Sequence, residues 1–467
     1  MNPMYLRKLA ATALLLIVPT GSAFADDGSN TPSDKTQQFR HAIVGGRAKN
    51  VILFLGDGMG DSEITIARNY HVGAAGRLAL DTLPLTGAYT TYPVQESNPS
   101  LPEYVTDSAA SGTGWATGHK TSNGRISTVA GSTGIAPYAT ILELAHAAGF
   151  RTGDVSTAEI TDATPAVLAS HVNARSCQGP ANMGPCPAYK KSAGGPGSIA
   201  EQLVEHGVDV LLGGGKQRFD QVIDGGPFIG KSVIQEAQAL GYTVVTDAAG
   251  LASVTPGQPV LGLFNSGNMS LEWTGQLAQP FPGSGPQQCT ENQRPSKEPS
   301  LAEMTTKALT LLDATPGAHG QGQAHGTPGF FLQVEGASID KQDHAENPCG
   351  QIGETVAFDK AIAVGLEYAK KHPDTLVIVT ADHAHTSQII EPVATNQTNH
   401  PGAYSVLTTA DGANMTVNYA TEPHGTSQDH TGAQVRIAAQ GPQAANVVGV
   451  SDQTDLFHTM ARALGLE

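Results

Sequence analysis

The chain has 467 residues, with 42 acidic and 26 basic side chains, and its formal net charge is −16. This acidic balance argues against a stable nucleic-acid partner, and it means that an anionic substrate has to be held by local cations rather than drawn in by the overall field. A chain of this length can bury a large core, and beyond the N-terminal segment no apolar run suggests a membrane span.

The N-terminus has the pattern of an export signal. Arg7 and Lys8 precede an apolar run at residues 9–18, and Ala23-Phe24-Ala25 forms a small-residue cleavage site. We therefore expect cleavage after Ala25 and a periplasmic or secreted protein. Residues 26–48 are polar and lack periodicity, which predicts an exposed N-terminal arm of the kind that often reaches a partner subunit.

Export also bears on the four cysteines, Cys177, Cys186, Cys289 and Cys349. In an exported protein two disulfides are expected rather than a zinc cage, and four cysteines allow three pairings. Cys177 and Cys186 flank a segment rich in proline and glycine, so the sequence favours a bond that closes this small loop and leaves Cys289 for Cys349. The other pairings remain open at this point.

Continuous apolar runs alternate with helical stretches along the chain. Residues 51–55 form an apolar run bounded by Gly56-Asp57-Gly58, as expected for a parallel strand buried on both faces. Similar runs occupy residues 208–212, 242–245, 260–264, 329–334 and 375–380, and the helical stretches between them include residues 139–148, 301–313 and 352–370. This alternation predicts an α/β fold, a doubly wound and mostly parallel sheet with helices on both faces.

Carboxylates follow three of these predicted strands. Asp57 comes after the first, Glu335 after the run at 329–334, and Asp382-His383 after the run at 375–380. Ligands of open parallel sheets bind beyond the carboxyl ends of the strands, so these acids are expected to meet at one edge. They would repel one another there unless cations held them together, which favours a metal site over three solvated loop ends.

A serine at the start of a predicted helix is the candidate nucleophile. In residues 105–113, Asp107 and Ser108 are good helix caps, and small residues that favour a helix follow them. The Ser108 hydroxyl would then lie near the positive end of the helix, where a phosphate is stabilised. Taken alone, a simple capping role is the better interpretation of Ser108, and only the remaining motifs reverse that preference.

Carboxylate and imidazole pairs supply the expected ligands. If the chain turns helical after Glu335, Asp340 and His344 share one face, and Asp382-His383 and Asp429-His430 offer further pairs. Oxygen and nitrogen ligands without thiolates favour zinc, with magnesium at an all-oxygen position. Other histidines are expected to face solvent or to be satisfied in the core: His71, His119, His146, His171, His206 and His372.

Four irregular segments, residues 178–197, 279–299, 315–328 and 391–424, are expected to be surface loops and a crown over the site. The segment at 315–326 contains two histidines, but its composition argues against tight metal binding.

Six segments together resemble bacterial periplasmic alkaline phosphatases in order and spacing: residues 55–60, 106–113, 155–165, 333–344, 380–383 and 428–432. The resemblance covers residues 50–467 and implies one catalytic domain over residues 49–467. It also implies a homodimer that hydrolyses small phosphate monoesters through a phosphoserine, and disulfides Cys177–Cys186 and Cys289–Cys349. The loop at 315–326 is longer than the short turn usual in the family.

Carried over by motif, the resemblance implies a role for each site residue. Ser108 would be the phosphorylated nucleophile and Arg175 the phosphate clamp, with Lys341 and Asp162 as an ion pair near the phosphate. Two Zn²⁺ and one Mg²⁺ are implied, held respectively by Asp340, His344 and His430; by Asp57, Asp382 and His383; and by Asp57, Thr164 and Glu335.

Two rival functions remain at the level of sequence. A sulfatase or phosphodiesterase could use the same metal frame, although related sulfatases carry a modified cysteine in a different motif, and a diester lacks the third free oxygen that suits Arg175. A secreted phosphate- or zinc-binding protein without turnover is the other alternative.

Overall fold

The computed structural model describes residues 34–313, 329–392 and 401–467. The predicted signal peptide at 1–25, residues 26–33 of the predicted arm and the loop at 315–326 lie outside these residues. Within them, no helix combines the length and the apolar character needed to cross a membrane.

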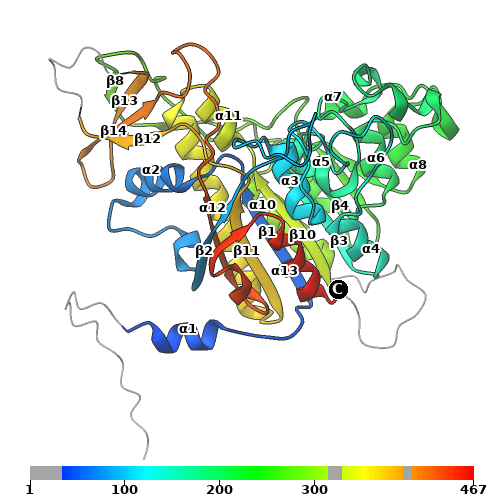
Figure 1. Cartoon of the computed structure of the whole chain (residues 1–467), viewed down its shortest axis with the longest axis horizontal. Helices are drawn as coiled ribbons and strands as arrows, with labels where there is room; N and C mark the ends of the chain where they lie inside the picture. The colour runs from blue at the N-terminus through cyan, green and yellow to red at the C-terminus, as the bar shows by residue number, and fades with distance from the viewer. Residues whose placement is uncertain (1–33, 314–328, 393–400) are drawn as a thin grey trace, which may run out of the picture.

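A ten-stranded sheet forms the centre of the described structure (Figure 1). Its strands, in spatial order, are β16 (Gly449–Asp452), β2 (Leu85–Thr90), β15 (Val435–Gln440), β11 (Thr375–Ala381), β1 (Asn50–Gly56), β10 (Phe330–Gly336), β3 (Arg151–Glu159), β4 (Val210–Gly214), β6 (Val260–Leu263) and β5 (Thr243–Val245). The strands from β11 to β5 are parallel, whereas β15 pairs antiparallel with both β11 and β2. The four central strands β11, β1, β10 and β3 are buried along their whole length.

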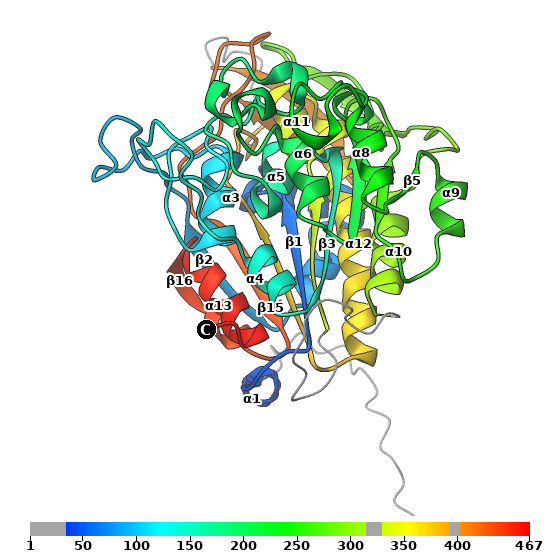
Figure 2. The same cartoon turned by 90° about the vertical axis from the view of Figure 1, so that its right-hand side faces the viewer.

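Helices cover both faces of this sheet. Figure 2 shows α10 (Leu301–Asp313) and α12 (Pro348–Lys371) on one side of β1 and β3, and α4 (Ile141–Ala147) and α13 (Asp455–Leu464) on the other. The remaining helices are α1 (Thr36–Ala42), α2 (Asp61–Val72), α3 (Ser108–Thr117), α5 (Ala163–Ala169), α6 (Ile199–Glu205), α7 (Lys216–Phe219), α8 (Val233–Ala239), α9 (Ala248–Ser253) and α11 (Ser338–His344). The predicted fold class is confirmed, and α1 in the N-terminal arm buries none of its residues.

The central strand β3 has no counterpart among the predicted strands. Its sequence contains Arg151, Asp154 and Glu159, so it lacks the apolar run that identified its neighbours, yet all nine residues are buried. The fold provides partners for the charged ends: Arg151 Nε lies 2.9 Å from Asp209, and Glu159 pairs with Arg218 at 2.7 Å. Burial is therefore tolerated because these charges are neutralised by residues distant in sequence.

The crown above the sheet is more regular than the sequence predicts. Segments expected to be irregular contribute β8 (Ser284–Gln287), β13 (Ala403–Thr408) and β14 (Asn414–Tyr419), which join β12 (Gln388–Ile390) in a four-stranded sheet. A two-stranded pair, β7 (Trp273–Thr274) and β9 (Thr290–Glu291), lies in the same part of the chain. The expectation of loops alone is wrong here, because a small buried cluster including Leu407, Val417 and Tyr419 gives these strands a core.

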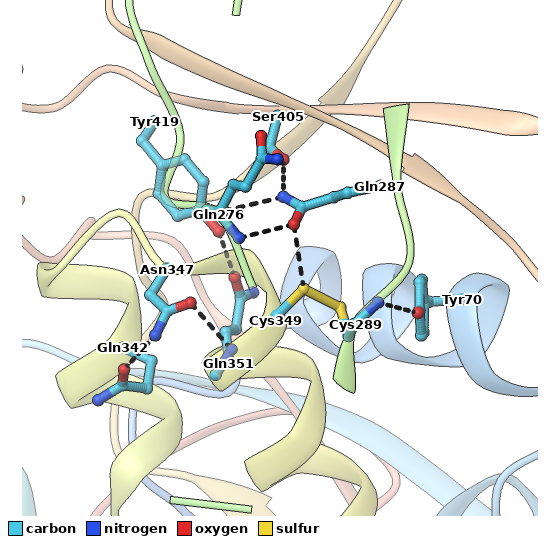
Figure 3. Close-up of a disulfide and its surroundings, with 11 residues drawn as sticks. Tyr70, Gln276, Gln287, Cys289, Gln342, Asn347, Cys349, Gln351, Ser405 and Tyr419 are labelled. Atoms are coloured by element: carbon cyan, nitrogen blue, oxygen red, sulfur yellow. Dashed lines mark hydrogen bonds between the residues drawn. A yellow bond between two sulfur atoms is a disulfide. The ribbon is translucent and has the colours of Figure 1, made fainter. Parts of the chain in front are cut away.

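Two disulfides are present, Cys177–Cys186 and Cys289–Cys349, and both predicted pairings are confirmed. The second disulfide links the crown to the start of α12 (Figure 3). Beside it, the Cys289 backbone N–H donates to the Tyr70 hydroxyl at 2.6 Å, and Gln287 donates to Ser405 Oγ at 2.9 Å. This disulfide therefore anchors the crown to the helical layer.

Replacing both Cys289 and Cys349 by serine should lower the free energy of unfolding by about 2–4 kcal/mol, because the bond closes a long loop of the unfolded chain. The matched Cys177→Ser, Cys186→Ser variant should lose less, since its cysteines are 9 residues apart rather than 60. Denaturant unfolding of the two variants measures both effects. Unchanged stability in the first variant, or four free thiols in protein recovered from the exporting cell, would contradict this prediction.

Candidate active site

The carboxyl ends of the central strands bring the predicted acids together. Leu55 of β1 lies level with Glu335 of β10 and with Thr380 of β11, so the residues that follow emerge at one edge. Asp57 comes directly after β1, and the next amide, that of Gly58, donates to Asp382 Oδ1 at 2.9 Å. Gly58 has a φ of +67°, and a Cβ there would lie 3.1 Å from the Cα of Asp340. A glycine is therefore needed for this close approach.

Ser108 is the first residue of α3, and the capping role belongs to its neighbour. Asp107 is the N-cap, and its Oδ1 accepts from the Ala110 amide at 2.9 Å. The Ser108 side chain is thus not needed to cap the helix, and its Oγ lies 3.4 Å from His383 Nε2. Ser108 is buried, with 2% of its surface exposed, at the end of the helix where negative charge is stabilised.

A first cluster of possible metal ligands surrounds one oxygen of Asp340. His344 Nε2 lies 3.4 Å from Asp340 Oδ1, and His385 Nε2 and His430 Nε2 each lie 3.2 Å from it. Asp340 and His344 share one face of α11, as their spacing predicts. Burial opposes ionisation of Asp340, but the facing imidazoles of His385 and His430 hold its pKa well below the usual range.

A second cluster contains Asp57, Asp382 and His383, all buried. His383 Nε2 lies 3.1 Å from Asp382 Oδ2 and 3.6 Å from Asp57 Oδ1. Burial, followed by the charges of Asp340 and Asp382, raises the pKa of Asp57 well above its usual value. Asp57 therefore lies at a point where several negative charges meet.

Glu335 lies within electrostatic reach of this cluster, and Thr164 lies beside Glu335. Burial raises the pKa of Glu335 to about 7, and Ser156 of the adjacent strand donates its hydroxyl to this carboxylate. Thr164, in the first turn of α5, is also buried, and its carbonyl accepts from Gln333 of β10 at 3.0 Å. Since Glu335 contributes to the raised pKa of Asp57, the two carboxylates are within electrostatic reach.

Arg175, Lys341 and Asp162 form a network beside Ser108. Lys341 Nζ lies 2.9 Å from Asp162 Oδ2, and Arg175 contacts Asp162 Oδ1 at 3.0 Å and Asp107 Oδ2 at 3.2 Å. Burial alone would raise the pKa of Asp162, but Lys341 and Arg175 hold it well below the usual range. The two carboxylates fix the guanidinium in place, and its other N–H groups remain available as donors.

Part of this site lines one open cleft of about 700 Å³. Its walls include Ser108, Arg175, Lys341, Asp340, His344 and His430. The cleft combines a hydroxyl, cationic donors and residues of the first cluster in a volume suited to a small ligand. The second cluster adjoins it through His383, which faces the Ser108 hydroxyl.

The residues present fit divalent metal ions. Asp57 Oδ1 is buried and accepts no hydrogen bond from the described residues, and burial together with neighbouring negative charge raises the pKa of Asp57. A cation at this oxygen would remove both costs. The first cluster supplies imidazole nitrogen and carboxylate oxygen, which suit zinc, whereas Glu335 and Thr164 supply only oxygen, which suits magnesium.

Comparison with known proteins identifies the family. The sequence profile of the alkaline phosphatase family matches residues 48–426 and 423–466. The chain belongs to the alkaline phosphatase family. It is 53% identical over 421 residues to streptomycin-6-phosphate phosphatase of Streptomyces griseus, covering 90% of this chain and 91% of the relative. It is 51% identical over 443 residues to alkaline phosphatase of Escherichia coli K12, covering 93% of this chain and 90% of that protein.

The structural comparison agrees with this assignment at the level of the fold. Thermus thermophilus alkaline phosphatase aligns with a TM-score of 0.65 at 23% identity, covering 94% of this chain and 96% of that one. As a member of the alkaline phosphatase family, the protein is a metal-dependent enzyme that hydrolyses phosphate monoesters. The alternative of a binding protein without turnover is thereby set aside.

One residue of the first cluster, His385, is absent from the site predicted from sequence. It is fully buried, and its Nε2 faces the same Asp340 oxygen as His430. Burial lowers the pKa of His385 to about 4, so the ring is neutral near pH 7. Its sequence signal is a position two residues after His383, shortly after the end of β11, and this alone does not distinguish it from the other histidines.

Proposed function

We propose that Ser108 is the nucleophile of this alkaline phosphatase and is phosphorylated during turnover. The observation that carries the proposal is the position of the Ser108 hydroxyl. Ser108 is the first residue of α3 and lines the cleft, and its Oγ lies 3.4 Å from His383 Nε2. Asp107, not Ser108, caps the helix. A serine that is spared from capping and lies beside a ligand cluster is suited to nucleophilic attack.

Two zinc ions and one magnesium ion are the proposed cofactors of each chain. Asp340, His344 and His430 would hold the first zinc, and Asp57, Asp382 and His383 the second. The magnesium would be held by Asp57, Thr164 and Glu335. When bound, such ions lower the pKa of an attacking hydroxyl or water and stabilise charge on the leaving oxygen.

The residues of the chain then act in two displacements. Ser108 Oγ attacks phosphorus, the bond to the ester oxygen breaks, and the alcohol leaves. A water molecule next attacks the phosphoserine, which releases inorganic phosphate and restores the Ser108 hydroxyl. Arg175 holds two oxygens of the phosphoryl group throughout, and Asp162 keeps its guanidinium oriented. Lys341, which also contacts Asp162, lines the cleft and places its ammonium near the phosphate.

The clamp at Arg175 favours monoesters over diesters. A monoester has three nonbridging oxygens, so two can meet the guanidinium while one stays near the ligand clusters. A diester has only two nonbridging oxygens, so it loses a contact either with the guanidinium or with the ligand clusters. A diesterase activity would therefore be minor. A serine at position 108, where related sulfatases use a modified cysteine, argues against a sulfatase.

Arg175→Ser should lower kcat/KM for p-nitrophenyl phosphate by about 10- to 100-fold, as expected for loss of a charged bidentate hydrogen bond. The loss for bis-p-nitrophenyl phosphate should be much smaller, and inhibition by inorganic phosphate should weaken. Arg175→Lys is the matched control that keeps the charge, and it should recover only part of the loss because an ammonium cannot present two parallel donors. Equal losses on both esters with unchanged phosphate inhibition would remove Arg175 from the site.

We also propose that residues 49–467 act as one catalytic domain in an exported, periplasmic or secreted homodimer. Two disulfides support an oxidising compartment. N-terminal sequencing of the mature protein should begin at Asp26, and light scattering should give the mass of a dimer.

A further inference from the structure

A third group of potential metal ligands lies outside the catalytic cleft. Glu143 is in α4, His171 follows α5, and His206 is the C-cap of α6. The Nε2 atoms of His171 and His206 each lie 2.9 Å from the same oxygen, Glu143 Oε1. None of the three residues lines the catalytic cleft or belongs to the clusters described above.

The hydrogen bonds of the two rings fix where their protons lie. His171 Nδ1 faces the Ser127 carbonyl at 3.0 Å, and His206 Nδ1 faces the Gln202 carbonyl at 2.8 Å. A carbonyl oxygen only accepts, so each Nδ1 carries the hydrogen. In the neutral rings both Nε2 lone pairs then point at the carboxylate. This geometry is repulsive unless two protons or one cation lie between the three groups.

The carboxylate is held in position as firmly as the rings. Glu143 Oε2 accepts from the Thr140 amide at 2.9 Å in the capping box of α4, which directs Oε1 toward the imidazoles. The His171 amide also donates to Gln202 Oε1 at 2.9 Å. The Ser127 and Gln202 carbonyls, which accept from the two ring Nδ1–H groups, are partners of the kind that orient metal-binding histidines and raise their basicity.

We propose that Glu143, His171 and His206 bind one divalent transition metal ion of the zinc class. The three ligand atoms lie within 4.8 Å of one another, and two nitrogens with one carboxylate oxygen are a common zinc ligand set. Ligand atoms of one tetrahedral zinc are about 3.3 Å apart, so the 2.9 Å pairs need to open by only a few tenths of an ångström. Side-chain exposures of 31% at His206 and 22% at Glu143 leave a path for the ion and a position for water.

A metal here would tie α4 and α6 to the segment after α5, which carries both His171 and Arg175. Val172 pairs with Ile126, and the Arg175 amide donates to the Gly124 carbonyl at 2.7 Å, so this segment is continuous with the loop after α3. The site is accordingly structural. Its occupancy should raise thermal stability while the chemistry at the catalytic cleft stays the same.

Zinc counting on the intact holoenzyme tests the proposal. Wild type, Glu143→Gln and His206→Ala are dialysed against zinc-buffered, magnesium-containing solutions of increasing free zinc, and bound zinc per chain is measured by mass spectrometry. Glutamine can keep the capping box of α4, so Glu143→Gln removes the charge without removing the cap. Exposed His41 of α1 gives the control variant His41→Ala. We expect both cluster variants to bind one zinc fewer per chain than wild type and His41→Ala, with kcat within twofold of wild type.

Thermal unfolding provides a second readout that separates binding from misfolding. The reference is the Tm of wild type at a free zinc concentration that saturates only the catalytic sites. When free zinc is 100-fold above the dissociation constant of the Glu143 site, occupancy of that site should raise the Tm by about 3 °C above this reference. This step should be absent from both cluster variants. Equal zinc stoichiometry and equal zinc-dependent Tm shifts in wild type and both variants would show that the three residues form only an ion-paired group, and would overturn the proposal.

Discussion

Ser108→Ala is expected to reduce turnover of p-nitrophenyl phosphate by roughly 10³-fold or more, the scale seen when a catalytic nucleophile is removed. Alanine can occupy the first turn of α3, and the N-cap Asp107 remains, so the helix should persist. Bound zinc and magnesium should stay at the wild-type level because Asp57, Asp340 and their partners are unchanged. Steady-state kinetics with metal analysis measures both outcomes.

Ser111→Ala is the matched control, one turn further along the same helix. The Ser111 hydroxyl donates to the Asp382 carbonyl at 2.7 Å, so this change should reduce stability but retain substantial turnover. Normal turnover in Ser108→Ala, or an equal loss in both variants, would contradict the nucleophile assignment.

Asp57→Ala should abolish most activity, because Asp57 is a proposed ligand of two metal ions. The loss of activity should exceed the roughly 100-fold that is typical when a residue hydrogen-bonded to a metal ligand is mutated. Asp57 lies beside His383 and within electrostatic reach of Glu335, so its loss should lower both zinc and magnesium content. Dialysis of the wild type against a chelator should cause a similar loss, restored better by zinc with magnesium than by either ion alone.

Asp429→Ala is the control for this prediction, because Asp429 is an exposed carboxylate that lines the same cleft. It should keep its metals and most of its activity. A fully active Asp57→Ala protein with wild-type metal content would contradict the proposed shared ligand.

Strands of the sheet could be predicted from sequence where a buried strand is also composed of apolar residues. Strands β1, β10 and β11 are apolar because helices cover both of their faces, and their sequences show it directly. Strand β3 was missed because Arg151 and Glu159 are neutralised by Asp209 and Arg218, partners that only the folded chain brings near. The crown strands β13 and β14 were missed because each is only six residues long and mixes apolar with polar residues, so neither contains a continuous apolar run.

In the candidate site, too, residues identified by local sequence spacing were predicted, and residues brought together only by the fold were missed. Asp340 and His344 could be assigned to one site from their helical spacing. Asp57 could be assigned to the site because it directly follows a buried strand. His385 could not be distinguished among 16 histidines until the fold placed it against Asp340. His171 is satisfied in the core, as expected, by Ser127 and by Glu143, 28 residues earlier in the chain. Only the folded chain brings His206 to the same Glu143 oxygen.

Acid quenching during turnover of phosphate-labelled substrate tests the central assignment most directly. We predict that the label is trapped as an acid-stable phosphoserine, and that peptide mapping places it on Ser108 in the wild type and finds no label in Ser108→Ala. Label on any other residue, or an active enzyme that traps none under conditions where phosphoserine hydrolysis limits the rate, would contradict the proposed mechanism.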